Sequence, residues 1–261
     1  MLRAFSTAAT GMTGQQMMVD VIANNLANVN TTGFKRSQIN FQDLLYVTER
    51  EPGTEVSAGI KSPSGVEIGS GVRVVSTTKV FTPGELQNTG RALDIAISGD
   101  GFLQVTMPNG DLRYTRDGSL QINANGQLVT SNGYTIEPAV SIPTDAVAVN
   151  IEKDGGINVT DSSGTQSVLG PLQLVRFPNP SGLGSEGDNL LSETEASGTP
   201  TTGTPGENGF GSIQSGFLEK SNVQMVTELV NLITAQRAYE INSRAIKAGD
   251  QMLQTANSVV R

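Results

Sequence analysis

Hydrophobic positions at both ends of the chain recur at helical spacing. Near the start, small or apolar residues alternate at intervals of three and four, which predicts a helix over residues 2–29 that stops near Asn30–Gly33. The same spacing returns at the end, with Ser221 or Asn222 as the expected N-cap. The two seams are Leu2, Phe5, Ala9, Met12, Gln16, Val19, Ala23 and Leu26, then Met225, Leu229, Leu232, Gln236, Tyr239, Ser243, Ile246, Asp250, Leu253, Asn257 and Val260.

The second seam contains a polar position in every seven-residue repeat. Gln236, Ser243, Asp250 and Asn257 form this polar rung beside an apolar one that begins at Leu232. Buried polar residues fix register in coiled coils. Our hypothesis is therefore that the polar rung sets the register of helix packing.

The middle of the chain alternates with the two-residue period of β-strands. Three Asn-Gly pairs, Asn109-Gly110, Asn125-Gly126 and Asn132-Gly133, separate alternating runs. Asn-Gly favours hairpins because both of its positions can take positive φ. Further short strands are expected at VAVNIE, INVT, SVLG and LQLVRF. The pattern predicts an antiparallel sheet or small barrel without an internal helix.

Two segments rich in glycine and proline, residues 46–72 and 178–211, interrupt this pattern. Such composition is typical of long loops or disordered linkers. In the first segment, alternation at Val66, Ile68, Val72 and Val74 favours an extended strand instead. Whether residues 178–211 are ordered stays open.

These elements predict a discontinuous α+β fold in which terminal helices form a coiled-coil assembly domain around a central all-β domain. The expected divisions are residues 1–34 (assembly helix), 35–74 (extended connector), 75–220 (β domain) and 221–261 (assembly helix).

Composition excludes several classes of function. The net charge of −8 and pI near 4.6 argue against nucleic acid, which needs a basic surface. Cys and His are absent, which removes thiol nucleophiles, the usual zinc ligands and the imidazole base. No run of about 18 apolar residues predicts a membrane span. The start lacks the apolar core of a secretory signal, so export, if any, is expected without a cleaved leader.

One motif suggests a cofactor. Residues 182–187, GLGSEG, match the dinucleotide-binding pattern G-x-G-x-x-G, but that site needs a helix opening at the last glycine. Here Pro178 and Pro180 precede the motif and a Ser/Thr/Gly/Pro run follows it. We expect no catalytic residue, no cofactor and no metal, and therefore no enzyme.

The first predicted helix carries almost no charge. Only Arg3 and Asp20 are charged in residues 2–32, where an exposed coiled coil normally has Lys and Glu beside its seam. Amides and small residues suit a helix packed on all sides by protein. We interpret the asparagines as contacts between subunits, whereas a single intramolecular helix pair is the plainer alternative.

The run GMTGQQMMVDVIANNLANVNTTGFKR closely resembles the N-terminal signature of the rod and hook axial proteins of the bacterial flagellum. SNVQMVTELVNLITAQRAYEINSRAIKAGDQMLQTA resembles their C-terminal signature, and TPGELQNTGRALDIAISGDGFLQV resembles the entry to their β domain. Length and the 46–72 segment point to the distal rod rather than the hook.

This resemblance implies a structural subunit that polymerises into a rigid tube, which transmits motor torque and conducts exported subunits. It implies terminal segments that are disordered in the monomer, and it makes the 46–72 segment the source of rod stiffness. The implied location is the basal-body rod, from the periplasm to the outer membrane. Implied partners are copies of the chain itself, proximal rod proteins, the hook protein, the surrounding P- and L-ring proteins and the flagellar type III export apparatus.

By the same resemblance, the subunit-assembly residues are Asn24, Asn25, Leu26, Asn28, Gly33 and Phe34, together with Gln236, Arg237, Tyr239 and Glu240 around Ala238. Two alternatives remain: a proximal rod or hook protein of the same family, and a monomeric β binding module on a coiled-coil stalk.

Overall fold

The computed structural model describes residues 2–53, 55–57 and 60–259. Among the predicted seam positions, Leu2 and Asn257 are described only in their backbone, and Val260 lies outside the described residues. The chain divides into two compact units. We call residues 1–26, 37–78 and 225–261 the helical unit, and residues 27–36 and 79–224 the β domain. The prediction of a discontinuous α+β fold is confirmed.

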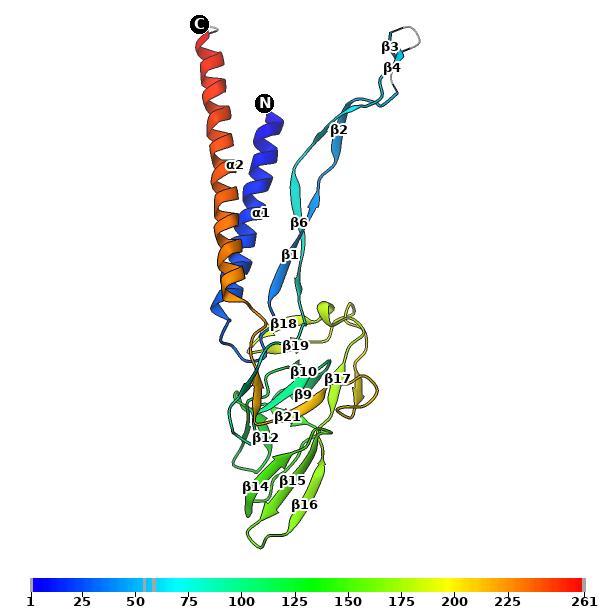
Figure 1. Ribbon diagram of the computed structural model, residues 1–261, viewed down its shortest axis with the longest axis vertical. Coiled ribbons are helices and arrows are strands. Elements are labelled where there is room, and N and C mark those ends of the chain that lie inside the picture. The colour runs from blue at the N-terminus through cyan, green and yellow to red at the C-terminus, as the bar shows by residue number, and fades with distance from the viewer. Residues whose placement is uncertain (1, 54, 58–59, 260–261) are drawn as a thin grey trace. The chain divides into compact units, whose positions relative to one another are not determined.

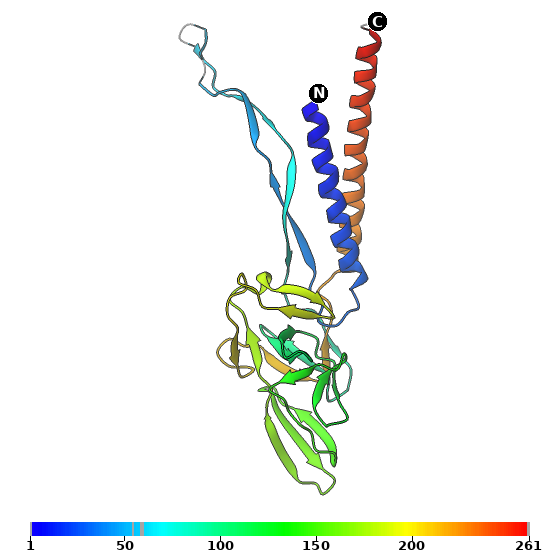
Figure 2. The same cartoon turned by 180° about the vertical axis from the view of Figure 1, so that it is seen from behind.

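The helical unit contains two long helices, α1 (Leu2–Ala27) and α2 (Met225–Val259). At 1.5 Å per residue they are about 39 and 52 Å long. They run side by side in both views, with the N- and C-termini at the same end of the pair (Figures 1 and 2). Facing residues, described below, make the pair antiparallel.

Both predicted helix boundaries need correction. α1 ends at Ala27, because residues 28–34 form turns closed by Thr31 N–H to Asn28 O and Phe34 N–H to Thr31 O. α2 begins at Met225, so neither Ser221 nor Asn222 is its N-cap. The Asn222 side chain instead accepts from Arg36 N–H and donates to the carbonyl of Val80. The Asn222 side chain, which was expected to cap α2, therefore makes long-range hydrogen bonds within the β domain instead.

The third part of the helical unit is a two-stranded ribbon made of nested pairs. β1 pairs with β6, β2 with β5 antiparallel, and β3 with β4 antiparallel. The strands are β1 (Ser37–Asp43), β2 (Tyr46–Arg50), β3 (Glu55–Ser57), β4 (Ile60–Lys61), β5 (Val66–Gly69) and β6 (Val72–Lys79). The alternation from Val66 to Val74 does mark extended backbone, but in two strands, β5 and β6, rather than one. Most of the described residues of the 46–72 segment lie in strands, so the loop interpretation is wrong for them.

The β domain is built around a nine-stranded sheet in the order β11-β12-β13-β9-β10-β19-β18, with β17 joining β9 to β20. Its strands are β9 (Phe102–Thr106), β10 (Leu112–Thr115), β11 (Leu120–Ile122), β12 (Leu128–Thr130), β13 (Thr135–Glu137), β17 (Leu174–Arg176), β18 (Gly184–Gly187), β19 (Leu190–Ser192) and β20 (Thr201–Gly203). The three hairpins predicted at the Asn-Gly pairs are confirmed.

Smaller sheets complete the domain. One is a three-stranded antiparallel sheet of β14 (Ala146–Ile151), β15 (Gly156–Asp161) and β16 (Gln166–Pro171). The other two are strand pairs: β8 (Ile95–Ser98) with β21 (Ser212–Ser215), and β7 (Leu86–Asn88) with β22 (Phe217–Glu219). The strands predicted at VAVNIE, INVT, SVLG and LQLVRF therefore all exist.

Alternation along β9 supplies two apolar clusters, one from each face of the strand. Leu103 and Val105 enter an aliphatic core with Ile97, Leu174 and other fully buried residues. Phe102, on the opposite face, enters an aromatic cluster with Tyr114 and Phe177. In that cluster the Tyr114 and Phe177 rings pack edge to face, with centroids 4.7 Å apart. Such geometry is favoured by the ring quadrupoles.

Five hairpins of the β domain share one three-residue loop. At Asn109-Gly110, Met107 N–H donates to Asp111 O and Gly110 N–H donates to Met107 O. The same two bonds close the loops at 123–127, 130–134, 152–156 and 161–165, and the glycine of each has φ between 79° and 86°. Only the glycine takes positive φ, so these are type I turns with a bulge. The expectation that Asn would adopt positive φ is wrong.

Residues 178–211 are ordered, which corrects the interpretation of this segment as a loop or disordered linker. A short 3₁₀ helix (Pro180–Gly182) leads into β18, which pairs with β19, and β20 pairs with β17. β18 ends at Gly187, and a turn into β19 follows where a dinucleotide-binding motif would need a helix. The GLGSEG run is therefore the start of a hairpin.

Two of these turns provide a matched test of glycine chemistry. A Cβ on Gly126 would lie 2.5 Å from the carbonyl oxygen of Ile142, whereas a Cβ on Gly110 would meet nothing within 4 Å. We predict that Gly110→Ala destabilises the domain by about 1 kcal/mol through positive φ alone. Gly126→Ala should cost on the order of 3 kcal/mol because a backbone clash is added. Urea denaturation followed by circular dichroism measures both, and equal losses would disprove the steric contribution.

Candidate assembly interface

Glycines let α1 and α2 approach closely. A Cβ on Gly11 of α1 would lie 2.9 Å from Nδ2 of Asn242, and one on Gly249 of α2 would lie 2.7 Å from the Phe5 ring. Gly11 faces Asn242, whereas the earlier residue Phe5 faces the later residue Gly249. The two helices are therefore antiparallel. Gly11 costs helix propensity of roughly 1 kcal/mol relative to Ala. The close contact explains why glycine stands there.

The ribbon packs on α1 through two more glycines. A Cβ on Gly14 would lie 3.1 Å from the ring of Phe41 in β1. Gly71, with φ of 113°, faces Thr10 of α1. α1 is thus covered on one side by α2 and on another by the ribbon. This supports the prediction of a helix packed by protein on several sides, but the neighbours belong to the same chain.

The α2 face toward α1 differs from the predicted seam. Its buried residues are Glu228, Ala235 and Gly249, and Asn242, which completes the seven-residue repeat, is half-buried. Small and polar side chains therefore face α1, because close helix approach leaves no room for large ones. The predicted seam lies beside this face: Leu232, Ser243, Ile246 and Leu253 are half-buried, whereas Met225, Leu229, Gln236, Tyr239 and Asp250 are exposed.

The α1 seam is half correct. Phe5, Met12, Val19 and Leu26 are half-buried, whereas Ala9, Gln16 and Ala23 are exposed. The fully buried positions of α1 are Gly14, Ile22 and Asn25. Periodicity located an apolar stripe but could not say that the ribbon, as well as α2, would cover this helix.

Large apolar side chains remain exposed along α2. We call this set the outer stripe: Met225, Val226, Leu229, Val230, Ile233, Tyr239, Ile241 and Met252, with exposed fractions from 42% to 75%. Several large apolar side chains exposed on one helix are typical of an interaction site. The outer stripe is therefore the strongest candidate for a subunit contact in the helical unit.

Four of the predicted assembly residues lie on α2 among the outer stripe. Gln236, Arg237, Tyr239 and Glu240 are all exposed, and Glu240 makes a loose ion pair of 3.9 Å with Arg244. Ala238 is half-buried. Their role between subunits stays a prediction.

The N-terminal set is placed differently. Asn24 is exposed and Leu26 is half-buried, whereas Asn25 is only 1% exposed. The Asn25 amide donates to Ser37 O at 2.9 Å and accepts from Ser37 N–H at 2.8 Å. These bonds join the last turn of α1 to the first residue of β1. The Asn25 amide, which the sequence analysis interpreted as a contact between subunits, therefore both donates to and accepts from a residue of its own chain.

Asn28, Gly33 and Phe34 belong to the β domain. Asn28 accepts from the Thr31 hydroxyl, and Gly33 donates its N–H to Glu219 O at 2.8 Å. Phe34 lies 5.3 Å from Lys79 Nζ in a cation–π contact. Gly33 has φ of 68°, and a Cβ there would lie 2.7 Å from the backbone between Arg116 and Asp117. Sequence alone thus grouped residues that the structure divides between two units.

Next to Gly33 lies a buried set of charges, Lys35, Arg116 and Glu219, which we call the junction cluster. Lys35 Nζ lies 2.5 Å from Glu219 Oε1, and Arg116 Nε lies 3.1 Å from Glu219 Oε2. All three side chains are at most 3% exposed. Burial lowers the pKa of Lys35, the charge of Arg116 lowers it further, and Glu219 opposes both.

The sequence analysis missed the junction cluster. Lys35 stands inside the N-terminal motif, and Glu219 is 184 residues away. Two unusual features were visible: Lys35-Arg36 ends a nearly uncharged run, and Glu219 ends a β run just before the second helix. Neither feature identifies the other residue as its partner.

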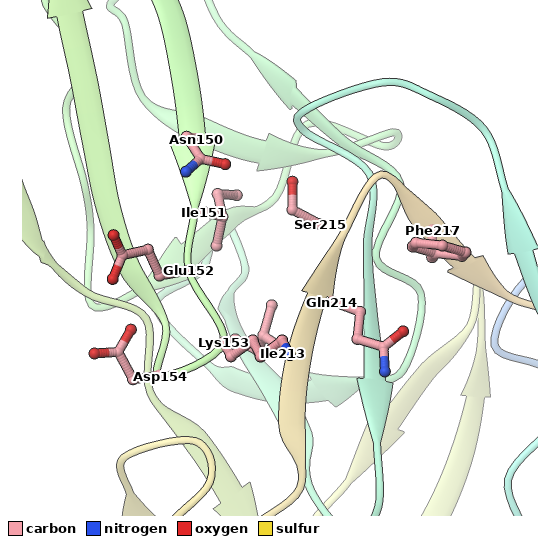
Figure 3. Close-up of a pocket in the computed structure, with 9 residues that line it drawn as sticks. All are labelled: Asn150, Ile151, Glu152, Lys153, Asp154, Ile213, Gln214, Ser215 and Phe217. Carbon is pink, nitrogen blue, oxygen red and sulfur yellow. The ribbon is translucent and has the colours of Figure 1, made fainter.

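The β domain also contains an open groove of about 710 Å³, lined by the β14–β15 turn and by β21 and β22 (Figure 3). Its carboxylates are already used: Glu152 accepts from Asn158, and Asp154 accepts from Gly156 N–H. Among the described residues, no group of three or more His, Cys, Asp or Glu could hold a metal ion. Neither described helix is long and apolar enough to cross a membrane. The groove offers no converging set of reactive groups.

Comparison with known proteins shows three family models that match this chain. Residues 5–35 match the family model of flagella basal body rod proteins, and residues 96–159 match the D1 domain of the flagellar hook proteins FlgE/F/G. Residues 214–259 match the C-terminal domain of the flagellar basal body rod proteins FlgEFG.

Full-length relatives extend this match. The flagellar basal-body rod protein FlgG of Buchnera aphidicola subsp. Schizaphis graminum is 50% identical over 255 residues, which cover 97% of this chain and 98% of the relative. FlgG of Borreliella burgdorferi is 45% identical over the whole of both chains. FlgG of Bacillus subtilis is 38% identical over 97% of both.

The chain therefore belongs to the flagellar basal-body rod and hook protein family. Within it, the chain is a structural subunit of the rod and not an enzyme.

The antiparallel register can be tested by cross-linking, because the chain contains no cysteine. A Cβ at Gly11 would lie 3.4 Å from Asn242 Cγ, within disulfide reach of a cysteine at 242. We predict that Gly11→Cys/Asn242→Cys oxidises to an intrachain disulfide at least tenfold faster than Gly14→Cys/Asn242→Cys, because Gly14 faces the ribbon. Non-reducing electrophoresis with peptide mapping measures both. Links formed only between chains would disprove intrachain pairing of α1 and α2.

Proposed function

We propose that this chain polymerises with copies of itself into the distal part of the flagellar rod. The helical units form an inner tube and the β domains an outer layer. The tube transmits motor torque to the hook and conducts exported subunits. The observation that carries the proposal is the outer stripe of α2, because a helix of a monomeric protein has no reason to expose so many large apolar side chains.

The outer stripe has a suitable counterpart on a second copy. The exposed face of α1 contains Ala9, Thr13 and Ala23, whose short side chains allow close approach, together with Gln16. We assign the contact to the outer stripe of one subunit and this face of α1 in the next. Covering a half-exposed valine or leucine contributes on the order of 1 kcal/mol, so the whole stripe supplies a substantial driving force.

The ribbon also needs neighbours. A two-stranded hairpin is marginally stable in water. Leu45 is 87% exposed and Tyr46 55%, and Val47, Val66 and Ile68 are exposed as well. We assign these side chains to contacts with adjacent subunits, which would brace each subunit against its neighbours. This agrees with the stiffness that the family resemblance attributes to residues 46–72.

The same proposal includes the chain's partners and location. The rod extends from the periplasm to the outer membrane inside the P- and L-rings, between the proximal rod proteins and the hook protein. The chain reaches it unfolded through the flagellar type III export apparatus. Support comes from the full-length similarity to rod proteins named FlgG.

A proximal place in the rod is the nearest alternative to a distal one. The other two alternatives from sequence, a hook protein and a monomeric β module on a coiled-coil stalk, do not agree with the full-length similarity to rod proteins. Pairing of α1 with α2 within one chain favours the stalk. A stalk built from this pair alone, however, would leave the outer stripe in water. Polymerisation accounts for both observations, so we prefer it.

The outer stripe can be tested with one charge. Ile233 is 51% exposed on α2, and Val147 is 73% exposed on the β domain. We predict that Ile233→Glu abolishes polymers of the purified chain, because a buried unpaired carboxylate is costly. Val147→Glu introduces the same carboxylate in the β domain and should leave polymerisation within a fewfold of the parent. Sedimentation and electron microscopy measure the polymers. Normal polymers from Ile233→Glu would disprove the proposed contact.

The polar rung gives a separate prediction. Gln236 is exposed within one chain, so only a second subunit could bury it. If it fixes register between subunits, Gln236→Leu should still polymerise but give a more variable helical repeat, since the polar constraint is lost. Image analysis of the polymers measures the spread of the repeat. An unchanged spread would refute the register hypothesis without affecting the polymer.

A further inference from the structure

We infer that residues 31–36, although they lie in the N-terminal assembly motif, are folded onto the β domain in the unassembled subunit, with Lys35 as the latch. The latch fixes the places where both terminal segments leave the β domain. This inference concerns the isolated chain and does not depend on the proposed function.

Four separate stretches of the β domain meet at this segment. Lys35 Nζ donates to Thr82 O at 2.8 Å and to Glu219 Oε1. Glu219 Oε1 also accepts from Gly84 N–H at 2.9 Å. On the other side, Arg116 donates to Gly99 O at 2.6 Å while its Nε pairs with Glu219. The Lys35 ammonium thus completes a network whose other members belong to the strands and turns of the domain.

The backbone on both sides of Lys35 is also hydrogen-bonded to other residues of the β domain. Gly33 N–H donates to Glu219 O, and Arg36 N–H donates to Asn222 Oδ1 at 2.8 Å. Arg36 O accepts from Val80 N–H at 3.0 Å. Thr32 adds a hydroxyl bond of 2.9 Å to Asp117. These bonds join the N-terminal segment to the residues just before α2.

None of these partners comes from the helical unit. Every bond of the latch joins residues of the β domain, which has its own aliphatic and aromatic cores. A domain of this size buries enough apolar surface to fold alone. If Lys35 were not docked, Glu219 would be buried with fewer partners, and a buried carboxylate needs its full set. The folded β domain therefore favours docking without a second subunit.

The latch has a consequence for how the helices form. It brings Arg36 and Asn222 into direct hydrogen-bond contact, so the two terminal segments start from one place. Tethering two segments at a common point raises the concentration of each near the other. The N-terminal segment that remains free in the unassembled subunit would then end before Thr31 rather than after Phe34.

Hydrogen–deuterium exchange of the dilute chain, shown to be monomeric by sedimentation, tests the latch. We expect amides of residues 31–36 to exchange at least tenfold more slowly than those of residues 10–24. In Lys35→Met, the protection of residues 31–36 should fall at least tenfold. Lys220→Met is the matched control, because Lys220 is exposed and directly follows Glu219.

Peptides from β9 and β10 report in the same experiment whether the β domain is folded. Equally fast exchange of residues 31–36 and 10–24 in the parent chain, with these peptides protected, would overturn the inference. So would unchanged protection of residues 31–36 in Lys35→Met. If residues 10–24 are also slow in the parent, loss of protection confined to residues 31–36 in Lys35→Met still supports the latch.

Discussion

One buried carboxylate organises the places where this chain changes from helix to sheet. Glu219 bonds Lys35 from the N-terminal motif and pairs with Arg116, which directly follows β10, so two cations share its charge. Desolvated charges of this kind are costly unless each is fully partnered, so the arrangement tolerates little variation in geometry. A discontinuous fold needs such a constraint, because segments far apart in sequence must enter and leave the β domain together.

In the helical unit, the side chains that pack within the chain differ in kind from those that stay exposed. The face of α2 that packs on α1 relies on small or polar residues, such as Asn242 against Gly11 and Gly249 against Phe5. Larger apolar groups such as Val226 and Ile241 stay outside. A chain that only had to pair its own helices would place them the other way round. The division is what a subunit needs if most of its burial energy is to come from neighbours.

Local features were predictable from sequence, and long-range partners were not. The Asn-Gly hairpins follow from turn chemistry within a few residues, and the two helices follow from periodicity. The seams were only half correct, because a repeat such as Phe5 to Leu26 identifies an apolar stripe but not the element that covers it. Asn222 was expected to cap α2, yet its amide bonds Arg36 and Val80 across the domain. For the Lys35–Glu219 pair, no local signal identifies either residue as the partner of the other.

The repeated three-residue loop affects how quickly the chain can acquire its structure. Each loop joins strands that are adjacent in sequence, so the central meander forms from contacts of short separation, which is the condition for rapid folding. The Lys35–Glu219 contact closes a loop of 184 residues and carries a large entropic penalty until the strands exist. We expect the meander to form first and the ends to be secured last. A chain with this order would keep its terminal segments available until its outer domain is complete.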